Sequence, residues 1–242
     1  MTLAVLATTY NEQENIVNFI TAVEGNLTTL SEKSYLVVAD GFSTDRTGEI
    51  INDLKSKYEN LVLLQSPKGG IGLAYREALP YVFNILQVDV VVTMDADLSH
   101  QPADITKLVA RIREGADLVI GSRYVAGGSI PSEWAWYRKV LSSLGNVIVR
   151  LLFGTWQIHE YTTAFRAFSK SLWERLDKTE LNFDDNTFLP AFVLAASHCR
   201  AQICEVPVTF KDRTAGKSKI EISKYAPRLF KYALEVFVKR ML

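Results

Sequence analysis

The stretch VVVTMDADLSH at residues 90–100 is an apolar, mostly β-branched run that ends in two carboxylates and a turn. Such a run is typical of a buried strand in a parallel sheet. Side chains alternate along a strand, so Asp95 and Asp97 would point the same way if the strand continued through them. Neighbouring carboxylates repel each other unless a cation lies between them, and hard divalent cations prefer such oxygen ligands. The stretch therefore predicts a metal site at a strand end; the alternative is that the pair caps the helix expected after Pro102.

Residues 1–94 show a regular alternation of expected strands and helices. We expect strands at residues 3–7, 35–39, 61–64 and 89–94. The helices between them are expected after a cap at Asn11, at residues 47–57 and at residues 73–86, where Pro80 should kink or restart the helix. This alternation is typical of a doubly wound, mostly parallel α/β sheet flanked by helices, whose ligands bind beyond the carboxyl ends of the strands. The polar segments at residues 8–12, 40–45 and 95–97 each follow a strand, so we expect them to share one ligand edge.

The remaining chain is expected to alternate less regularly. Strands are expected at residues 118–121, 162–168 and 204–210, with helices at residues 105–114, 134–153, 170–176, 186–197 and 221–241. No repeat or linker interrupts the chain, so we expect one domain at residues 1–219 followed by a basic amphipathic helix at residues 220–242. A helix of this kind lies at a membrane interface, or packs on its own domain or on a partner.

Composition excludes several classes of protein. Acidic and basic residues number 27 each in a chain of 242, so no overall charge favours a nucleic-acid partner. Cys199 and Cys204 lie in an apolar stretch and are expected to be reduced core residues. No signal peptide is recognisable, and no uncharged apolar run approaches the roughly 20 residues that span a bilayer. We expect a cytoplasmic protein that is at most peripheral at the cytoplasmic face of a membrane.

Six blocks of sequence carry a resemblance to a known family. They are TYNE at residues 9–12, DGFSTDRT at 40–47, KGGIG at 68–72, DADLSH at 95–100, GSRY at 121–124 and DRTAGKSK at 212–219. Together they resemble the family-2 glycosyltransferases of GT-A fold, and within that family the dolichol- or polyprenol-phosphate mannosyltransferases. The resemblance covers the chain from Leu3 to about Lys219.

The resemblance implies a site for a nucleotide sugar and a divalent cation. Asp95 and Asp97 would bind Mg²⁺ or Mn²⁺, and Asp97, Arg123, Arg213 and Lys219 would carry catalysis, because the departing diphosphate develops negative charge. The donor-binding residues implied are Thr8, Tyr10, Glu12, Asp40, Asp95, Ala96, Asp97, Arg123, Arg213 and Lys219. For Arg123 the alternative is a structural salt bridge. For Arg213 and Lys219 the alternative is that the basic loop at residues 212–219 is exposed to solvent and binds no phosphate. The KGGIG block lacks the G-K-[ST] ending of a P-loop. Its glycines are expected to permit close backbone packing.

Two residues depart from the pattern of the resembled family. Ala39 stands where the family commonly has a first Asp before Asp40, and Glu160 stands where it usually has Asp. The first change affects the expected contact with the donor base. The second falls where the acceptor is expected to bind.

The implied reaction is inverting transfer of mannose from GDP-mannose to a polyprenyl or dolichyl phosphate. A phosphate acceptor is already an anion and needs no general base, which agrees with the absence of a Ser-His-Asp set. His100 is read as a site neighbour or a locally bonded loop residue, and Arg138 and Lys139 as cations ahead of an apolar helix. The alternatives are transfer of another sugar, such as glucose from UDP-glucose, to a lipid or glycan, and a non-catalytic sugar-nucleotide-binding or membrane-adaptor protein. A membrane-protein partner is a further expectation.

Overall fold

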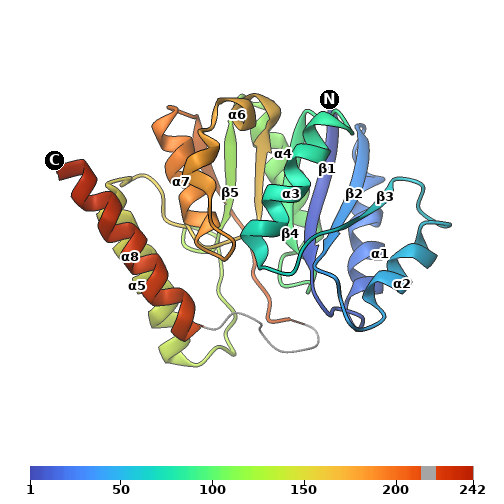
Figure 1. Cartoon of the computed structure of the whole chain (residues 1–242), viewed down its shortest axis with the longest axis horizontal. Coiled ribbons are helices and arrows are strands. Elements are labelled where there is room, and N and C mark those ends of the chain that lie inside the picture. Colours follow the sequence, from blue (N-terminus) through green and yellow to red (C-terminus); the bar gives the residue numbers. More distant parts are fainter. Residues whose placement is uncertain (214–221, 242) are drawn as a thin grey trace.

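The chain forms a seven-stranded sheet between two layers of helices (Figure 1). The computed structural model describes residues 1–213 and 222–241, the first three of the latter only in their backbone. The strand order is β3-β2-β1-β4-β6-β5-β7, and every neighbouring pair is parallel except those of β6, which runs antiparallel to β4 and β5. The strands are β1 (Thr2–Thr9), β2 (Lys33–Asp40), β3 (Leu61–Gln65), β4 (Val90–Asp95), β5 (Leu118–Ser122), β6 (Arg166–Ser169) and β7 (Ile203–Pro207). The predicted mostly parallel α/β sheet is confirmed.

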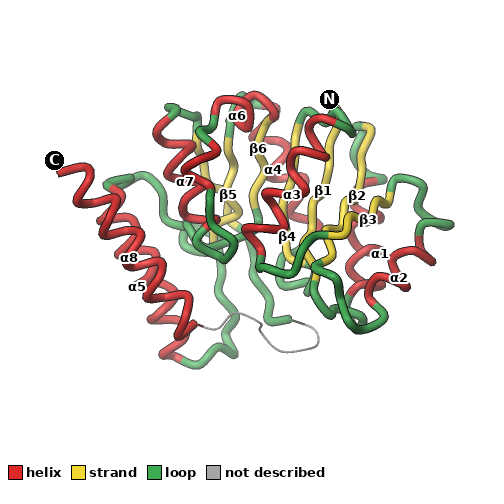
Figure 2. Tube along the Cα trace, viewed as in Figure 1, coloured by secondary structure: helices red, strands yellow, loops and turns green. Residues whose placement is uncertain are grey.

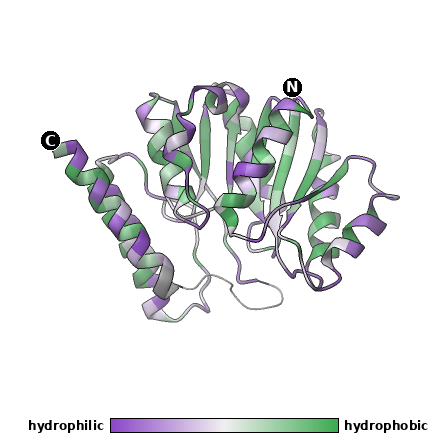
Figure 3. Ribbon diagram, in the orientation of Figure 1, coloured by the Kyte–Doolittle hydropathy of each residue, from purple (hydrophilic) through white to green (hydrophobic). Residues whose placement is uncertain are grey.

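Apolar side chains on both sides of the strands bury the sheet. In β1, Leu3, Val5 and Ala7 face one cluster of core residues, whereas Ala4 and Leu6 face the other. The first cluster is covered by α1 (Ile16–Leu27), α2 (Thr47–Leu54) and α4 (Ile105–Arg113). The second is covered by α3 (Ile71–Asn84), α6 (Lys170–Arg175) and α7 (Phe188–His198). Figure 3 shows the strands as the most continuously apolar part of the molecule. Short 3-10 helices lie at Pro102–Asp104 and Lys178–Leu181.

The structure differs from two local predictions, a cap at Asn11 and a restart of the helix at Pro80, whereas the alternative of a kink at Pro80 stays a prediction. The helix α1 begins at Ile16 with Asn15 as its N-cap, because Asn11 has a positive φ of 52° and accepts the Thr44 N–H at 2.8 Å instead. Pro80 lies inside α3, which runs as one helix from Ile71 to Asn84 rather than restarting.

Two long helices, α5 (Trp136–Phe153) and α8 (Ile222–Met241), lie together beside one end of the sheet (Figures 1 and 2). Leu229 and Ala233 of α8 are buried in the same core cluster as α7, and the Tyr232 ring lies 5.7 Å from the Phe153 ring. The helix α8 is thus packed onto the domain. The predicted domain boundary at residue 219 lies outside the described residues. Within the part of the chain that the structure describes, no helix is both long and apolar enough to cross a bilayer.

Candidate active site

The polar segments that follow β1, β2 and β4 converge at one edge of the sheet. Thr8, near the end of β1, is paired with Ala39 on one side and with Asp95 on the other. Thr9 is paired with Asp40. Because these strands are parallel, their carboxyl ends and the loops after them meet at this edge. The predicted shared edge is confirmed.

A turn, not a continued strand, sets the positions of the two carboxylates. The strand β4 ends at Asp95, Ala96 is buried in the core, and Leu98 has a positive φ of 62°. Asp97 then turns back, so that its Oδ1 accepts the Ser99 N–H at 3.0 Å. The strand does not continue through Asp97, so strand alternation does not set the relative directions of the two side chains. The capping alternative also fails, because α4 begins at Ile105 with Asp104 at its N-cap.

A cation from the far end of the chain reaches this carboxylate pair. The Arg213 Nη2 lies 3.1 Å from Asp97 Oδ2, although the two residues are far apart in sequence. Burial and the charge of Asp97 raise the pKa of Asp95 to about 7, and Arg213 and Arg123 oppose this rise. The Asp95 side chain nevertheless keeps 37% of its surface exposed, so it faces outward at the sheet edge. Negative charge is thus concentrated where a ligand can reach it.

The carboxylate pair fits a divalent cation. Two hard oxygen donors suit Mg²⁺ or Mn²⁺, and Mg²⁺ commonly takes only one or two carboxylates with phosphate and water oxygens completing its shell. Burial and the neighbouring Asp97 both disfavour the charged form of Asp95 and raise its pKa, and a bound cation would favour that charged form. Within residues 1–213 and the described part of α8, no group of three or more His, Cys, Asp or Glu side chains could hold a metal ion.

The loop after β2 is fixed by Asp40. This residue is 2% exposed; its Oδ1 accepts the Thr9 hydroxyl at 3.1 Å and its Oδ2 accepts the Ser43 N–H at 2.9 Å. Across the loop, the Glu12 N–H donates to the Thr47 hydroxyl at 2.9 Å. Asp40 therefore shapes the loop, and its contact with a donor base stays a prediction, as do those of Thr8 and Glu12.

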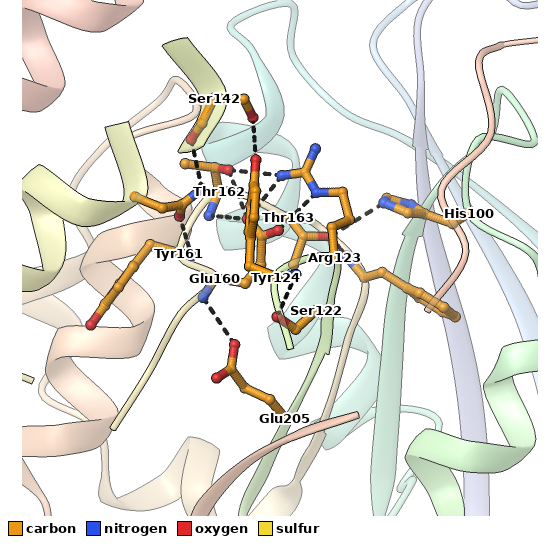
Figure 4. Close-up of polar contacts among 12 residues, drawn as sticks. His100, Ser122, Arg123, Tyr124, Ser142, Glu160, Tyr161, Thr162, Thr163 and Glu205 are labelled. Atoms are coloured by element: carbon orange, nitrogen blue, oxygen red, sulfur yellow. Dashed lines mark hydrogen bonds and ion pairs between the residues drawn. The ribbon is translucent and has the colours of Figure 1, made fainter. Parts of the chain in front are cut away.

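Arg123 is held by a buried carboxylate. Its Nε and Nη2 lie 2.8 and 2.9 Å from the two oxygens of Glu160, and Nη2 also donates to the Thr162 hydroxyl at 3.1 Å (Figure 4). Burial alone would raise the pKa of Glu160, but Arg123 and Thr162 lower it overall. Burial alone would lower the pKa of Arg123, but the charge and hydrogen bonds of Glu160 raise it overall. The salt-bridge alternative is therefore realised, and a phosphate contact by Arg123 stays a prediction.

Comparison with known proteins decides the family. The model of the family described as "Glycosyl transferase family 2" matches residues 4–176. The chain belongs to this family. It is 32% identical over 231 residues to the polyprenol monophosphomannose synthase of Mycolicibacterium smegmatis, a match that covers 95% of the chain and 84% of the relative. It is also 32% identical to the dolichol-phosphate mannosyltransferase of Pyrococcus furiosus, covering 98% of the chain and 66% of that longer relative.

The family-2 glycosyltransferase also matches solved structures. Glucosyl-3-phosphoglycerate synthase from Mycobacterium tuberculosis, crystallised with Mn²⁺, uridine diphosphate and phosphoglyceric acid, superposes with a TM-score of 0.70. The match covers 98% of the chain and 78% of the other, at 16% identity, and so shows the GT-A fold alone. The predicted family, fold and enzyme class, a hexosyltransferase, are confirmed.

An aromatic group that the sequence did not reveal borders the glycosyltransferase site. The His100 ring stacks on Phe165 at 5.1 Å and meets the edge of Phe210 at 5.4 Å, and Phe210 in turn meets Trp134 at 5.6 Å. The Arg138 guanidinium lies over the Trp134 ring at 3.8 Å. These residues come from four separate segments, and no spacing in the sequence links them.

His100 is a buried site neighbour in this group. Its Nδ1 accepts the Asp95 N–H at 3.0 Å, and burial lowers the pKa of His100 to about 4. The imidazole is therefore neutral at pH 7, with its proton on Nε2 toward Thr163.

Lys68 opens the KGGIG block, but the sequence did not predict that it contacts a site residue. Its Nζ lies 4.8 Å from the centre of the Tyr10 ring, and this contact lowers the pKa of the Tyr10 hydroxyl. Lys68 follows β3 at the same sheet edge, so its position after a strand was the available signal. Lys219, which was predicted to act beside Arg213, lies outside the described residues.

Proposed function

We propose that this glycosyltransferase transfers mannose from GDP-mannose to a polyprenyl or dolichyl phosphate, with inversion and with dependence on Mg²⁺ or Mn²⁺. The observation that carries the proposal is the approach of Arg213 to Asp97 beside Asp95, at the carboxyl ends of the strands. The relatives from M. smegmatis and P. furiosus support mannose as the sugar and a lipid phosphate as the acceptor.

On the donor side, the chain would hold a nucleoside diphosphate against positive charge. Asp95 and Asp97 would bind the cation, which would neutralise the negative charge that develops on the departing diphosphate. Arg213, with Lys219 from the same loop, would add hydrogen bonds to phosphate oxygens, for which a guanidinium is well shaped. Tyr10 would stack on the base, and Thr8, Glu12, Asp40 and the Ala96 backbone would border the nucleoside.

On the acceptor side, a second guanidinium lies next to the same loop. The Arg138 Nη1 is 3.8 Å from Asp212 Oδ1, and Asp212 directly precedes Arg213. A phosphate monoester bound by Arg138 and Arg123 could attack without a general base, because its oxygens are already ionised. We infer that the enzyme works peripherally at the cytoplasmic face of a membrane, where such lipids present their phosphates; a membrane-protein partner is an additional proposal.

The test is a transfer assay with defined donors and acceptors. The protein is mixed with undecaprenyl phosphate in detergent and with radiolabelled GDP-mannose, or with labelled UDP-glucose, in Mg²⁺, in Mn²⁺ or in EDTA. Label that enters the organic phase is counted, and the anomeric configuration of the product is read by NMR. We expect β-linked mannosyl product from GDP-mannose, abolished by EDTA and by Asp97→Ala.

Each other outcome contradicts part of the proposal. Transfer from UDP-glucose and not from GDP-mannose would contradict the proposed donor. Transfer that continues in EDTA would contradict the proposed dependence on a metal ion. A product with the same anomeric configuration as the donor would contradict the proposed inversion. Donor binding without transfer to any lipid phosphate would favour a non-catalytic sugar-nucleotide-binding protein.

A further inference from the structure

The His100 ring hydrogen-bonds two segments of the chain that are far apart in the sequence. Its Nδ1 accepts the backbone N–H of Asp95, the last residue of β4, at 3.0 Å. Its Nε2 lies 3.3 Å from the hydroxyl of Thr163, in the segment at residues 160–165 that precedes β6 (Figure 4). Because Nδ1 is an acceptor here, a neutral ring carries its proton on Nε2 and donates it to the Thr163 hydroxyl. His100 therefore joins the strand end that carries Asp95 to the 160–165 segment.

The 160–165 segment holds the Arg123 guanidinium. Besides its ion pair within this segment, Arg123 donates from Nη2 to the Thr162 hydroxyl at 3.1 Å. Thr162 and Thr163 are adjacent, so a displacement of Thr163 would be passed directly to a side chain that Arg123 contacts. His100 thus binds the backbone segment one residue away from a contact of Arg123.

Other contacts also attach the 160–165 segment to β4. The Thr93 hydroxyl donates to the Ala164 carbonyl at 2.6 Å, and β6 pairs with β4 directly after the segment. These contacts lie at the end of the segment that leads into the sheet, whereas His100 binds nearer the end that holds Arg123. Loss of the His100 contact should therefore misplace Arg123 without detaching the segment.

The segment that carries Arg213 packs against the same ring. Phe210 meets His100 in an edge-on arrangement with 5.4 Å between the ring centres, and the Arg123 guanidinium lies 5.2 Å from the centre of the Phe210 ring. Three residues further along the chain, Arg213 reaches Asp97 at 3.1 Å. His100 therefore lies where the three segments that carry or hold the charged side chains of the site meet.

The alternative is that His100 only fills space in the core. The ring is 2% exposed and stacks on Phe165 with 5.1 Å between the ring centres. Packing alone does not account for a polar ring, because an apolar side chain would fill this space without two buried nitrogens that need partners. Burial lowers the pKa of His100, so the ring is neutral at pH 7 and acts through its hydrogen bonds rather than through charge.

We propose that His100 is a positioning residue that aligns the two halves of the site through its two ring nitrogens. Nδ1 fixes the backbone from which the Asp95 carboxylate faces the sugar donor and its cation. Nε2 fixes the 160–165 segment and, through it, the position of Arg123 beside the lipid phosphate. This inference rests on the proposed function, which assigns Asp95 to the sugar donor and Arg123 to the acceptor. His100 itself is buried and contacts neither substrate.

Three substitutions separate the two hydrogen bonds. His100→Asn keeps an oxygen near the position of Nδ1 and has no atom that reaches Thr163. His100→Gln places its amide near the position of Nε2 and leaves the Asp95 N–H without its partner. Thr163→Val keeps the branched shape of threonine and removes only the hydroxyl. The control is His198→Asn, which removes a ring that lies 2.9 Å from Glu180 outside the site.

The test measures the two halves of the site separately. Transfer is followed with undecaprenyl phosphate and GDP-mannose varied in turn, and the joint binding of Mn²⁺ and GDP is measured by calorimetry. Thr163→Val and His100→Asn should raise the KM for the lipid phosphate about 3- to 10-fold, the effect of losing one hydrogen bond, and should bind Mn²⁺ and GDP as the wild type does. His100→Gln should weaken the binding of Mn²⁺ and GDP by a similar factor and leave the KM for the lipid phosphate within about twofold of the wild type. The control should change neither quantity.

A spectroscopic measurement tests the geometry without turnover. In NMR spectra of protein labelled with ¹⁵N-histidine, His100 should be the Nε2–H tautomer, and its Nε2 proton should be protected from exchange with solvent. Thr163→Val should reduce that protection, whereas His198→Asn should not.

Three results would overturn the proposal: an Nδ1–H tautomer of His100, variants with wild-type constants throughout, or variants in which both halves of the site weaken together in proportion to their loss of stability in urea. The last result would assign His100 to the core. A wild type that binds Mn²⁺ and GDP and shows the expected tautomer, but transfers no mannose, would support the contact of His100 with Asp95 and contradict the proposed function alone.

Discussion

The Arg123 guanidinium and the Glu160 carboxylate form a buried two-point ion pair, with Nε 2.8 Å from Oε2 and Nη2 2.9 Å from Oε1. Glu160 is fully buried and its backbone N–H donates to Glu205, which also accepts the N–H of His159. The pair therefore joins the end of β5 to the segment before β6. It fixes Arg123 at the border of the site, in the region where the resemblance places the acceptor.

Removing the carboxylate should destabilise the protein strongly. Glu160→Ala leaves the Arg123 charge buried without its partner, which we expect to lower the free energy of unfolding by about 3–5 kcal/mol. Urea unfolding followed by circular dichroism measures the change. The control is Glu180→Ala, which removes a solvent-exposed contact with the His198 ring and should change the free energy of unfolding by less than about 1 kcal/mol. Equal effects of the two substitutions would contradict a structural role for the Arg123–Glu160 pair.

The same pair should make stability depend on acid pH. Arg123 holds the pKa of Glu160 below its ordinary value of 4.5, so the folded state binds fewer protons here than the unfolded state. The stabilisation is fully present above pH 4.5 and is lost as the pH falls through the lower, folded pKa. Urea unfolding of wild type and Glu160→Gln should therefore differ most near neutral pH, and the difference should shrink below pH 4.5. A difference that stays constant down to pH 3 would refute this assignment.

The charge of Asp97 should matter to turnover more than its hydrogen bond does. Asp97→Asn removes the charge that faces Arg213, and we expect kcat for mannosyl transfer to fall by about 10²–10³-fold. The control is Asp177→Asn, because Asp177 accepts the Thr179 N–H at 2.9 Å in the same local geometry, outside the site. That variant should keep wild-type turnover. If Asp97→Asn retained most of its activity with an unchanged unfolding temperature, the carboxylate would not belong to the reaction centre.

The early strands were predictable because their signals are local. Apolar runs that end in polar residues located β1, β2 and β4, and parallel pairing then brought Thr8, Asp40 and Asp95 to one edge. The antiparallel insertion of β6 was not predictable, since residues 162–165 look like a strand but instead turn past Arg123 and Glu160. Asn11 looked like a helix cap from its place before the helix. The sequence could not show that its side chain instead accepts the Thr44 N–H from another loop.

The sequence was sufficient to predict which charged residues belong to the candidate site, but not which of them contact one another. The order of the sequence blocks indicated that Arg213 belongs with Asp97, and the structure brings them to 3.1 Å. The sequence left open whether Arg123 faces a ligand or a carboxylate, because that choice depends on Glu160, 37 residues away. The contact of Lys68 with Tyr10 likewise depends on how two loops approach each other.

The glycines at the start of α3 should be required for close packing, as the sequence predicted. A Cβ at Gly72 would lie 2.8 Å from the carbonyl oxygen of Asp185 and still closer to that of Phe183, so the backbone would have to move. We expect Gly72→Ala to lower the free energy of unfolding by about 1–3 kcal/mol. The control is Gly25→Ala in α1, where nothing lies within 4 Å of the added carbon. That substitution should raise the free energy of unfolding by roughly 0.5–1 kcal/mol, because alanine favours a helix. Urea unfolding of both variants checks the signs, and stabilisation by Gly72→Ala would mean that the loop at residues 183–185 yields freely.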